Sequence, residues 1–158
     1  MTFSIVACDL KEKSWGIAVA SKFPAVGAVV PWAQADAGVV ATQSFANTSF
    51  GPRGLAMMAT GLSAEEVLAS LLENDADKDL RQVGLVDAKG GSATFTGAGC
   101  FNWAGGTSGK GYAIQGNPAV DERGEAMARL YSPRIVALYR EGTALTSADS
   151  PVTHTAGR

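Results

Sequence analysis

The sequence has a single histidine, His154, and only two cysteines among its 158 residues. Ser-His-Asp triads and Cys-His dyads need a well-placed imidazole, and most zinc sites need several histidines or cysteines. Two cysteines are also too few for a disulfide framework, and Cys8, inside an apolar run, is expected to be a buried structural residue. We therefore expect no metal and no cofactor. Any catalysis must use Thr, Ser, Cys, Lys, Asp or Asn side chains or the amine of the chain itself.

Charge is also scarce. Charged residues make up 18% of the chain, and 13 basic against 15 acidic side chains leave a net charge of −2. Such a chain lacks the basic surface that is typical of nucleic-acid-binding proteins. Its apolar runs all end well short of the roughly 18 residues of a membrane-spanning helix, and no basic start followed by an apolar segment marks a signal peptide. We expect a cytoplasmic protein that binds neither nucleic acid nor a membrane.

Hydrophobic residues are plentiful, at 46% of 158 residues. This length and composition are typical of one domain with a sizeable core. The last residues are rich in Thr, Ser and Ala and show no apolar periodicity, which favours a loose tail. We therefore expect a single domain over residues 1–142 and a tail over residues 143–158.

Apolar runs bounded by turn-forming residues predict the strands. Residues 2–9 and 15–21 are separated by a short polar turn and are expected to form a β-hairpin. A glycine-rich segment, residues 105–111, is expected to be a loop. Further strands are predicted at residues 27–31, 38–42, 82–87, 92–97 and 111–116.

Three segments have helical patterns. A short helix is expected at residues 54–60, and another is expected at residues 120–131. A third begins at Ser63, where Ser63 and Glu66 have the spacing of a capping box. Strands and helices are grouped along the chain rather than alternating, which indicates an α+β fold.

Thr2 is the residue that best fits catalysis without histidine. Initiator Met is normally removed when the next residue is small, and removal would leave Thr2 with a free α-amine at the head of a strand. Such a residue supplies both a nucleophilic hydroxyl and the base that takes the hydroxyl proton. An α-amine has a pKa of about 7.7–8.0, so a useful fraction is neutral near pH 7. The alternative is a β-prone residue that only begins a strand.

Lys22 is a candidate to assist Thr2. It directly follows the second strand of the predicted hairpin, which runs back toward the start of the first. The register of that hairpin can bring Ser21 or Lys22 close to Thr2, and a nearby ammonium lowers the pKa of an amine or a hydroxyl. The alternative is a solvated lysine at a strand end.

Four further residues are candidates for binding the substrate or its oxyanion. Asn47 and Arg53 lie in a turn before a helix, where backbone amides can form an oxyanion hole. Gln115 and Asn117 lie at the end of a predicted strand, where their side-chain amides can do similar work. Each of these residues alone is also typical of turns and helix caps.

Several long motifs then indicate a family. The segments TFSIVACD, GLSAEEVLASLL, RQVGLVDAKG, FTGAGCFNWAGG and GYAIQGN resemble the domain-of-unknown-function 1028 family, and the resemblance runs from Thr2 to about Tyr131. That family resembles a branch of the N-terminal nucleophile (Ntn) hydrolase superfamily. The resemblance implies an αββα sandwich of two antiparallel sheets between helical layers, in which the first residue of the mature chain is the nucleophile. Members of the superfamily are mostly amidohydrolases and peptidases.

The resemblance makes Thr2 the expected nucleophile of a hydrolase that cleaves an amide or peptide bond in a small-molecule or peptide substrate. It implies no role for Lys22 or the four binding candidates beyond placing them inside family motifs. After about Tyr131 the chain departs from the family, so the sandwich is expected to be truncated at its C-terminus. An exposed sheet edge would favour a homodimer. The alternative function is a non-catalytic small-molecule-binding or assembly protein on the same fold.

Overall fold

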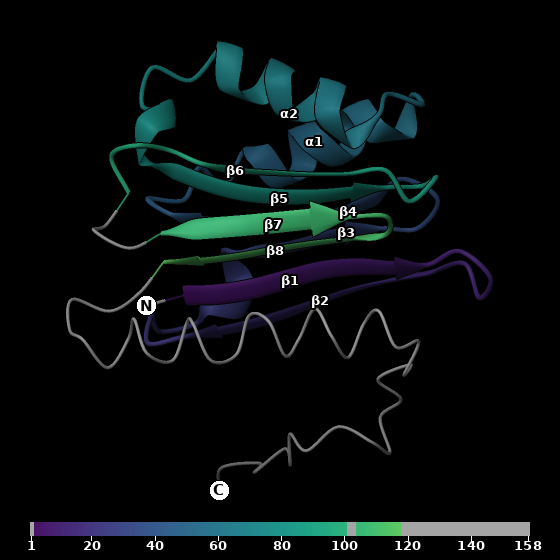
Figure 1. Cartoon of the computed structure of the whole chain (residues 1–158), viewed down its shortest axis with the longest axis horizontal. Coiled ribbons are helices and arrows are strands. Elements are labelled where there is room, and N and C mark those ends of the chain that lie inside the picture. Colours follow the sequence, from purple (N-terminus) through teal and green to yellow (C-terminus); the bar gives the residue numbers. More distant parts are fainter. Residues whose placement is uncertain (1, 101–103, 118–158) are drawn as a thin grey trace, which may run out of the picture.

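A computed structural model of the chain describes residues 2–100 and 104–117. In these residues two four-stranded antiparallel sheets are stacked, and two α-helices pack against the outer face of one sheet (Figure 1). This arrangement confirms the predicted α+β class. It also supplies the two adjacent sheets that the resemblance implied.

The first sheet holds both ends of the described chain. Its strands are β1 (Thr2–Asp9), β2 (Ser14–Ser21), β7 (Gly105–Gly109) and β8 (Tyr112–Asn117), in the order β2-β1-β8-β7. The predicted hairpin is therefore confirmed. The loop predicted at residues 105–111 is wrong, because residues 105–109 form β7 and pair with β8.

The second sheet is built from the middle of the chain. Its strands are β3 (Pro31–Gln34), β4 (Gly38–Ser44), β5 (Arg81–Asp87) and β6 (Ser92–Thr96), in the order β3-β4-β5-β6. The strand predicted at residues 27–31 is wrong. That stretch overlaps the 3₁₀ turn η1 (Val26–Ala28), and the strand begins only at Pro31.

The helices are α1 (Phe50–Ala59) and α2 (Ala64–Glu73), and a 3₁₀ turn, η2 (Lys78–Leu80), leads into β5. The capping box at Ser63 is confirmed: its side chain accepts from the Glu66 backbone N–H, and the Glu66 carboxylate accepts from the Ser63 N–H. Helix α1 begins four residues before the predicted start. The helix predicted at residues 120–131 and the tail predicted at residues 143–158 lie outside the described residues.

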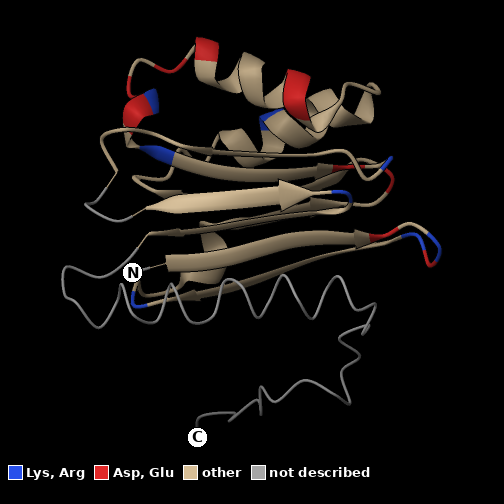
Figure 2. Ribbon diagram, viewed as in Figure 1, with Lys and Arg blue, Asp and Glu red and all other residues tan. Residues whose placement is uncertain are grey.

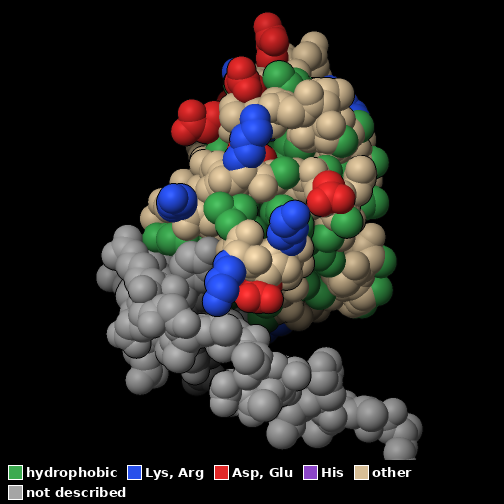
Figure 3. Space-filling model, turned by 90° about the vertical axis from the view of Figure 1, so that its right-hand side faces the viewer, with side chains coloured by type: hydrophobic (Ala, Val, Ile, Leu, Met, Phe, Trp, Pro, Cys, Tyr) green, Lys and Arg blue, Asp and Glu red, His purple; other side chains and the backbone are tan. Residues whose placement is uncertain are grey.

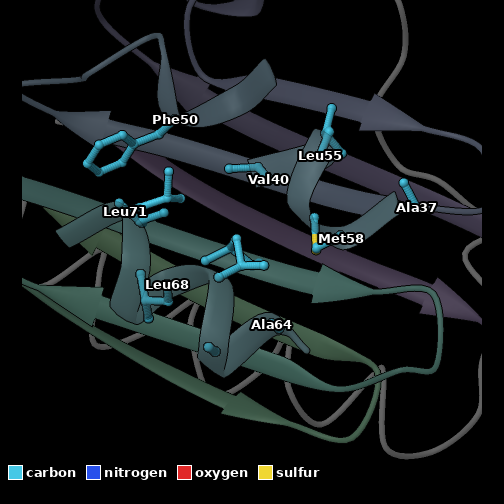
Figure 4. Packing of buried hydrophobic residues seen from close by; sticks show 12 residues of the cluster. Ala37, Val40, Phe50, Leu55, Met58, Ala64, Leu68 and Leu71 are labelled. Carbon is cyan, nitrogen blue, oxygen red and sulfur yellow. The ribbon is translucent and has the colours of Figure 1, made fainter. Parts of the chain in front are cut away.

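Strand alternation divides the interior into two apolar layers. One side of the second sheet packs against both helices, where Phe50, Leu71 and Leu85 are fully buried (Figure 4). The other side faces the first sheet across a smaller apolar cluster that includes Val6, Val39, Ala41, Val86 and Ala113. This apolar cluster fills part of the space between the two sheets, and buried polar side chains such as Gln43 and Gln115 occupy another part.

Charged residues are concentrated on the turns and helices, and the strands are almost free of them (Figure 2). At the end of the molecule that carries the turn between β1 and β2, basic and acidic side chains are interspersed with apolar ones (Figure 3). None of the described helices is long and apolar enough to cross a membrane.

Candidate functional site

Thr2 lies between the two sheets, at the end of the molecule where β1 begins and β2 ends. Alternate residues of β1 face the opposite sheet, and Ser4, Val6 and Cys8, which share the alternation of Thr2, are buried. In the first sheet Thr2 pairs with Ser21 on one side and with Asn117 on the other. The register thus places Thr2 between a hydroxyl and a carboxamide.

All three polar groups of Thr2 are hydrogen-bonded. Its nitrogen donates to Asn117 Oδ1 at 3.2 Å, and its Oγ1 is 2.9 Å from Ser21 Oγ. Its carbonyl oxygen accepts from Gln43 Nε2 of the facing sheet at 3.3 Å. Contacts from β2, β4 and β8 therefore fix the position of the nitrogen and of the hydroxyl.

Behind Thr2 the apolar layer gives way to a buried network of amides. Gln43, Gln82 and Gln115 are essentially inaccessible to solvent, and Asn117 is 2% exposed. Gln82 Oε1 accepts from Gln43 Nε2 at 2.8 Å and from Asn117 Nδ2 at 3.1 Å. Ser4 Oγ accepts from Gln115 Nε2 at 2.7 Å and donates to Gln43 Oε1. The network joins both sheets and keeps its buried polar groups paired, as burial demands.

A glycine on β5 makes room for this network. A Cβ added at Gly84 would lie 2.1 Å from Gln115 Oε1, which is far inside van der Waals contact. The absence of a side chain at residue 84 therefore lets the Gln115 amide lie against the backbone of the facing sheet.

Cys8 also lies on the inner face of β1, nearer the opposite end of the strand. Burial raises the pKa of its thiol, and the carboxylates of Asp87 and Asp9 raise it further. Both effects disfavour the thiolate, which is the nucleophilic form of cysteine. This agrees with the structural role expected for Cys8.

Of the six predicted site residues, the structure brings together Thr2, Gln115 and Asn117. Only Asn117 contacts Thr2 through its side chain. The Gln115 side chain is directed to Ser4 and Thr94 instead. Lys22 lies one residue past the end of β2 and is exposed.

Asn47 and Arg53 lie elsewhere, on the helix side of the second sheet. The Asn47 carboxamide donates to Asp75 Oδ2 at 3.1 Å and accepts from the backbone and hydroxyl of Ser49, so it organises the loop after β4. Arg53 is an exposed residue of α1. The structure does not bring either residue to Thr2.

The Asn47 loop is fastened by an ion pair. Arg81 Nε lies 2.8 Å from Asp75 Oδ2, and its Nη2 lies 3.1 Å from Asp75 Oδ1. Arg81 Nη1 also donates to the carbonyl of Phe45 at 2.7 Å. The Arg81 hydrogen bonds hold the pKa of the Asp75 carboxyl well below its usual range, with help from the Asn47 amide.

Gln43, Gln82 and Ser4 were not among the predicted site residues. Each is a buried polar residue of a strand that is rich in apolar residues, in VVATQS, RQVGLVD and TFSIVAC respectively. That pattern was a usable signal, because a polar side chain on a buried face needs partners there. What it could not supply was the pairing between strands far apart in the sequence.

The arrangement can support nucleophilic chemistry at Thr2. The hydroxyl and the nitrogen of this residue are held beside a serine hydroxyl and the carboxamide of Asn117. Among the described residues no group of three or more His, Cys, Asp or Glu side chains could hold a metal ion.

The fold and the sequence are both similar to those of known proteins. A crystal structure of a Silicibacter pomeroyi protein of the DUF1028 family is similar, with a TM-score of 0.71 and 28% sequence identity. The match covers 81% of this chain and 60% of that one, so the chain spans less than two thirds of that protein. No curated protein matches. The model of the family of unknown function DUF1028 matches residues 2–145, which extends past Tyr131, where the sequence motifs suggested a departure. The chain therefore belongs to DUF1028, a family of unknown function.

Proposed function

We propose that the protein is an Ntn-type hydrolase of an amide or peptide bond, with Thr2 as its N-terminal nucleophile once Met1 is removed. The observation that carries the proposal is the double anchoring of Thr2: its nitrogen on Asn117 Oδ1 and its Oγ1 beside Ser21 Oγ. An N-terminal nucleophile needs its hydroxyl and its amine held in one geometry, and the contacts of the Thr2 hydroxyl and of its peptide nitrogen, which becomes the amine when Met1 is removed, support such a geometry.

The hydroxyl and the α-amine of Thr2 carry out the proposed reaction together. Thr2 Oγ1 attacks the substrate carbonyl carbon, and its proton passes to the neutral α-amine. The C–N bond then breaks, and the departing amine takes that proton, which leaves an acyl ester on Thr2. Water attacks the ester with the α-amine again as base, and releases the acid and the free hydroxyl.

Three residues near Thr2 have separate roles in the proposed reaction. Asn117 Oδ1 accepts from the α-amine and orients it. Ser21 Oγ hydrogen-bonds the nucleophilic oxygen and aligns it. Lys22, one residue past Ser21, remains a proposed electrostatic aid, because an ammonium near the site would favour the oxyanion of the intermediate.

A β-lactone probe tests the nucleophile, because an activated hydroxyl opens the strained ring and keeps the acyl group as an ester. Protein that intact mass shows to begin at Thr2 should gain one probe mass, which peptide fragmentation places on Thr2 Oγ1. The Thr2→Val variant keeps the α-amine and the β-branched shape but lacks the hydroxyl, and it should gain none.

Thr107→Val is the matched control, because Thr107 is an exposed residue of β7. It should be labelled like the wild type. Equal labelling of Thr2→Val and wild type, or a wild type beginning at Thr2 that takes up no probe, would contradict the hydrolase proposal. The second outcome would favour a non-catalytic binding or assembly protein on this fold.

A further inference from the structure

We propose that Gln82, on the sheet opposite Thr2, is a positioning residue that sets the orientation of the Asn117 amide and thereby of the Thr2 α-amine. The inference deepens the proposed function, on which its catalytic meaning rests. Gln82 lies behind Asn117 in the buried network, and its link to the Thr2 nitrogen runs through Asn117, whereas Gln43 joins it to the Thr2 carbonyl.

The orientation of the Gln82 amide is fixed by its surroundings. Gln82 Nε2 is 2.9 Å from the carbonyl oxygen of Gly116 and 3.2 Å from that of Gly105. It is also 3.0 Å from Thr96 Oγ1. Carbonyl oxygens can only accept hydrogen bonds, so the nitrogen end of the amide must face them. Gln82 Oε1 therefore points the other way, as an acceptor.

The acceptor end of Gln82 then fixes Asn117. Asn117 Nδ2 donates to Gln82 Oε1 at 3.1 Å, so Asn117 Oδ1 is turned toward the Thr2 nitrogen at 3.2 Å. A flipped Asn117 would set an oxygen against Gln82 Oε1 and an N–H against the Thr2 nitrogen. Gln82 is fully buried and Asn117 is 2% exposed, so water has little access to repair such a mismatch.

Among the described residues, the side chains that contact Thr2 are uncharged, so none of them shifts the proton affinity of its amine by a direct charge. They are Asn117 from β8, Gln43 from β4 and Ser21 from β2. Two charged residues adjoin the site along the chain: Lys22, which follows Ser21 and is exposed, and Arg81, which precedes Gln82 and is paired with Asp75. The direction of the Asn117 amide is therefore a main local influence on the proton affinity of the Thr2 amine.

The expected effect has a definite sign. An acceptor favours the ammonium form of an amine and raises its pKa, whereas a facing N–H donor lowers it. In Gln82→Met the Asn117 amide loses its fixed partner, so the pKa of the Thr2 α-amine should fall. Acylation of Thr2 Oγ1 should slow by about tenfold to a hundredfold, because the base is no longer held in line with the hydroxyl.

Gln82→Glu should keep the amine pKa of the wild type. Its second carboxyl oxygen faces the carbonyl oxygens of Gly116 and Gly105 at a fully buried position, so the carboxyl should be protonated and donate there as Nε2 does. Its other oxygen still accepts from Asn117 Nδ2, so an unchanged pKa in this variant shows that the acceptor matters. Gln82→Asn, which is one methylene shorter and cannot reach Asn117, should lower the pKa like Gln82→Met and carries the test if that variant does not fold.

The measurement uses full-length protein that begins at Thr2. The pH dependence of α-amine acetylation by dilute acetic anhydride, followed by mass at Thr2, gives the pKa of the amine. Labelling by the β-lactone gives the rate at Oγ1. Val83→Ala is the control, because Val83 is a buried neighbour on β5 that faces the helices. It should keep the wild-type pKa and rate.

Two outcomes separate this inference from the proposed function. An amine pKa that falls in Gln82→Met and is kept in Gln82→Glu, with no labelling of Oγ1 in any form, would support the positioning role and overturn the nucleophile. Labelling of Thr2 in Gln82→Met or Gln82→Asn with the same pKa and rate as in Val83→Ala would overturn the role of Gln82 and leave the nucleophile in place.

Discussion

At the scale of single residues, the candidate site depends on carboxamides rather than on charges. Asn117 accepts from Thr2 and donates to Gln82 at the same time, which a carboxylate or an apolar side chain cannot do. Thr2 could be proposed from its place in the sequence, since a small second residue is exposed by Met removal. Gln82 and Gln43 could not, because their partners lie on strands that only the stacking of two sheets brings near.

Asn117→Leu tests the carboxamide. Leucine has a similar size but cannot accept from the amine, so labelling of Thr2 by the β-lactone should slow by about tenfold to a hundredfold. Ser108→Ala, at an exposed residue of β7, is the control and should label at the wild-type rate. An unchanged rate in folded Asn117→Leu would show that the contact at 3.2 Å does not orient the base.

At the scale of secondary-structure elements, predictions with a clear local signal were confirmed, whereas the apolar run at residues 27–31 and the strand that depends on a distant partner were predicted wrongly. The hairpin of β1 and β2 and the Ser63 capping box are local, and both were predicted. Strand β7 was missed because GGTSG has little intrinsic preference for a strand. It is a strand because β8 pairs with it, and sequence spacing does not reveal that partner.

Asp87 illustrates how side chains join the elements. Its Oδ2 accepts from the Ala64 N–H at the start of α2 at 2.9 Å, and its Oδ1 accepts from the N–H groups of Lys89 and Gly91 in the turn after β5. Asp87→Ala leaves these donors unpaired and should lower the free energy of unfolding by about 2–4 kcal/mol in urea titrations. Asp79→Ala, at an exposed residue of η2, should change it by less than about 0.5 kcal/mol. A similar effect of both substitutions would contradict this role.

The Asp75–Arg81 pair gives a pH-dependent prediction. The pKa of Asp75 lies below its usual value of 3.8 in the fold, so the pair stabilises the protein above about pH 4 and loses this contribution as the pH falls. Asp75→Asn should lower the free energy of unfolding by about 2–3 kcal/mol at pH 7, and by less at pH 3. Equal urea midpoints of wild type and variant at pH 7 would contradict the account.

At the scale of the whole molecule, the apolar layers hold the frame and the amide network occupies one end of it. Leu71 is fully buried between the helices and the second sheet, whereas Leu10 in the β1–β2 turn is 42% exposed. Leu71→Ala should lower the free energy of unfolding by about 2–5 kcal/mol, and Leu10→Ala by less than about 1 kcal/mol. Thermal and urea unfolding measure both changes, and a larger loss of stability in Leu10→Ala than in Leu71→Ala would contradict the prediction.

The edge of the first sheet bears on assembly. In the described part of the chain β2 is an edge strand of eight residues, SWGIAVAS, without charge or proline. Such an edge favours pairing with another strand, which motivates the proposal of a homodimer. Sedimentation velocity should give the mass of a dimer, and Ala18→Pro on the edge strand should shift it to a monomer. A wild type that is monomeric at all concentrations would contradict the proposal.

In the proposed mechanism the Thr2 α-amine serves as the base for its own hydroxyl. The most direct test compares β-lactone labelling of two forms of the same chain, one beginning at Thr2 and one that retains Met1, by intact mass and peptide fragmentation. An ester on Thr2 Oγ1 is expected only in the form that begins at Thr2, because a peptide nitrogen cannot act as base. Equal labelling of both forms, or labelling at another residue, would contradict it.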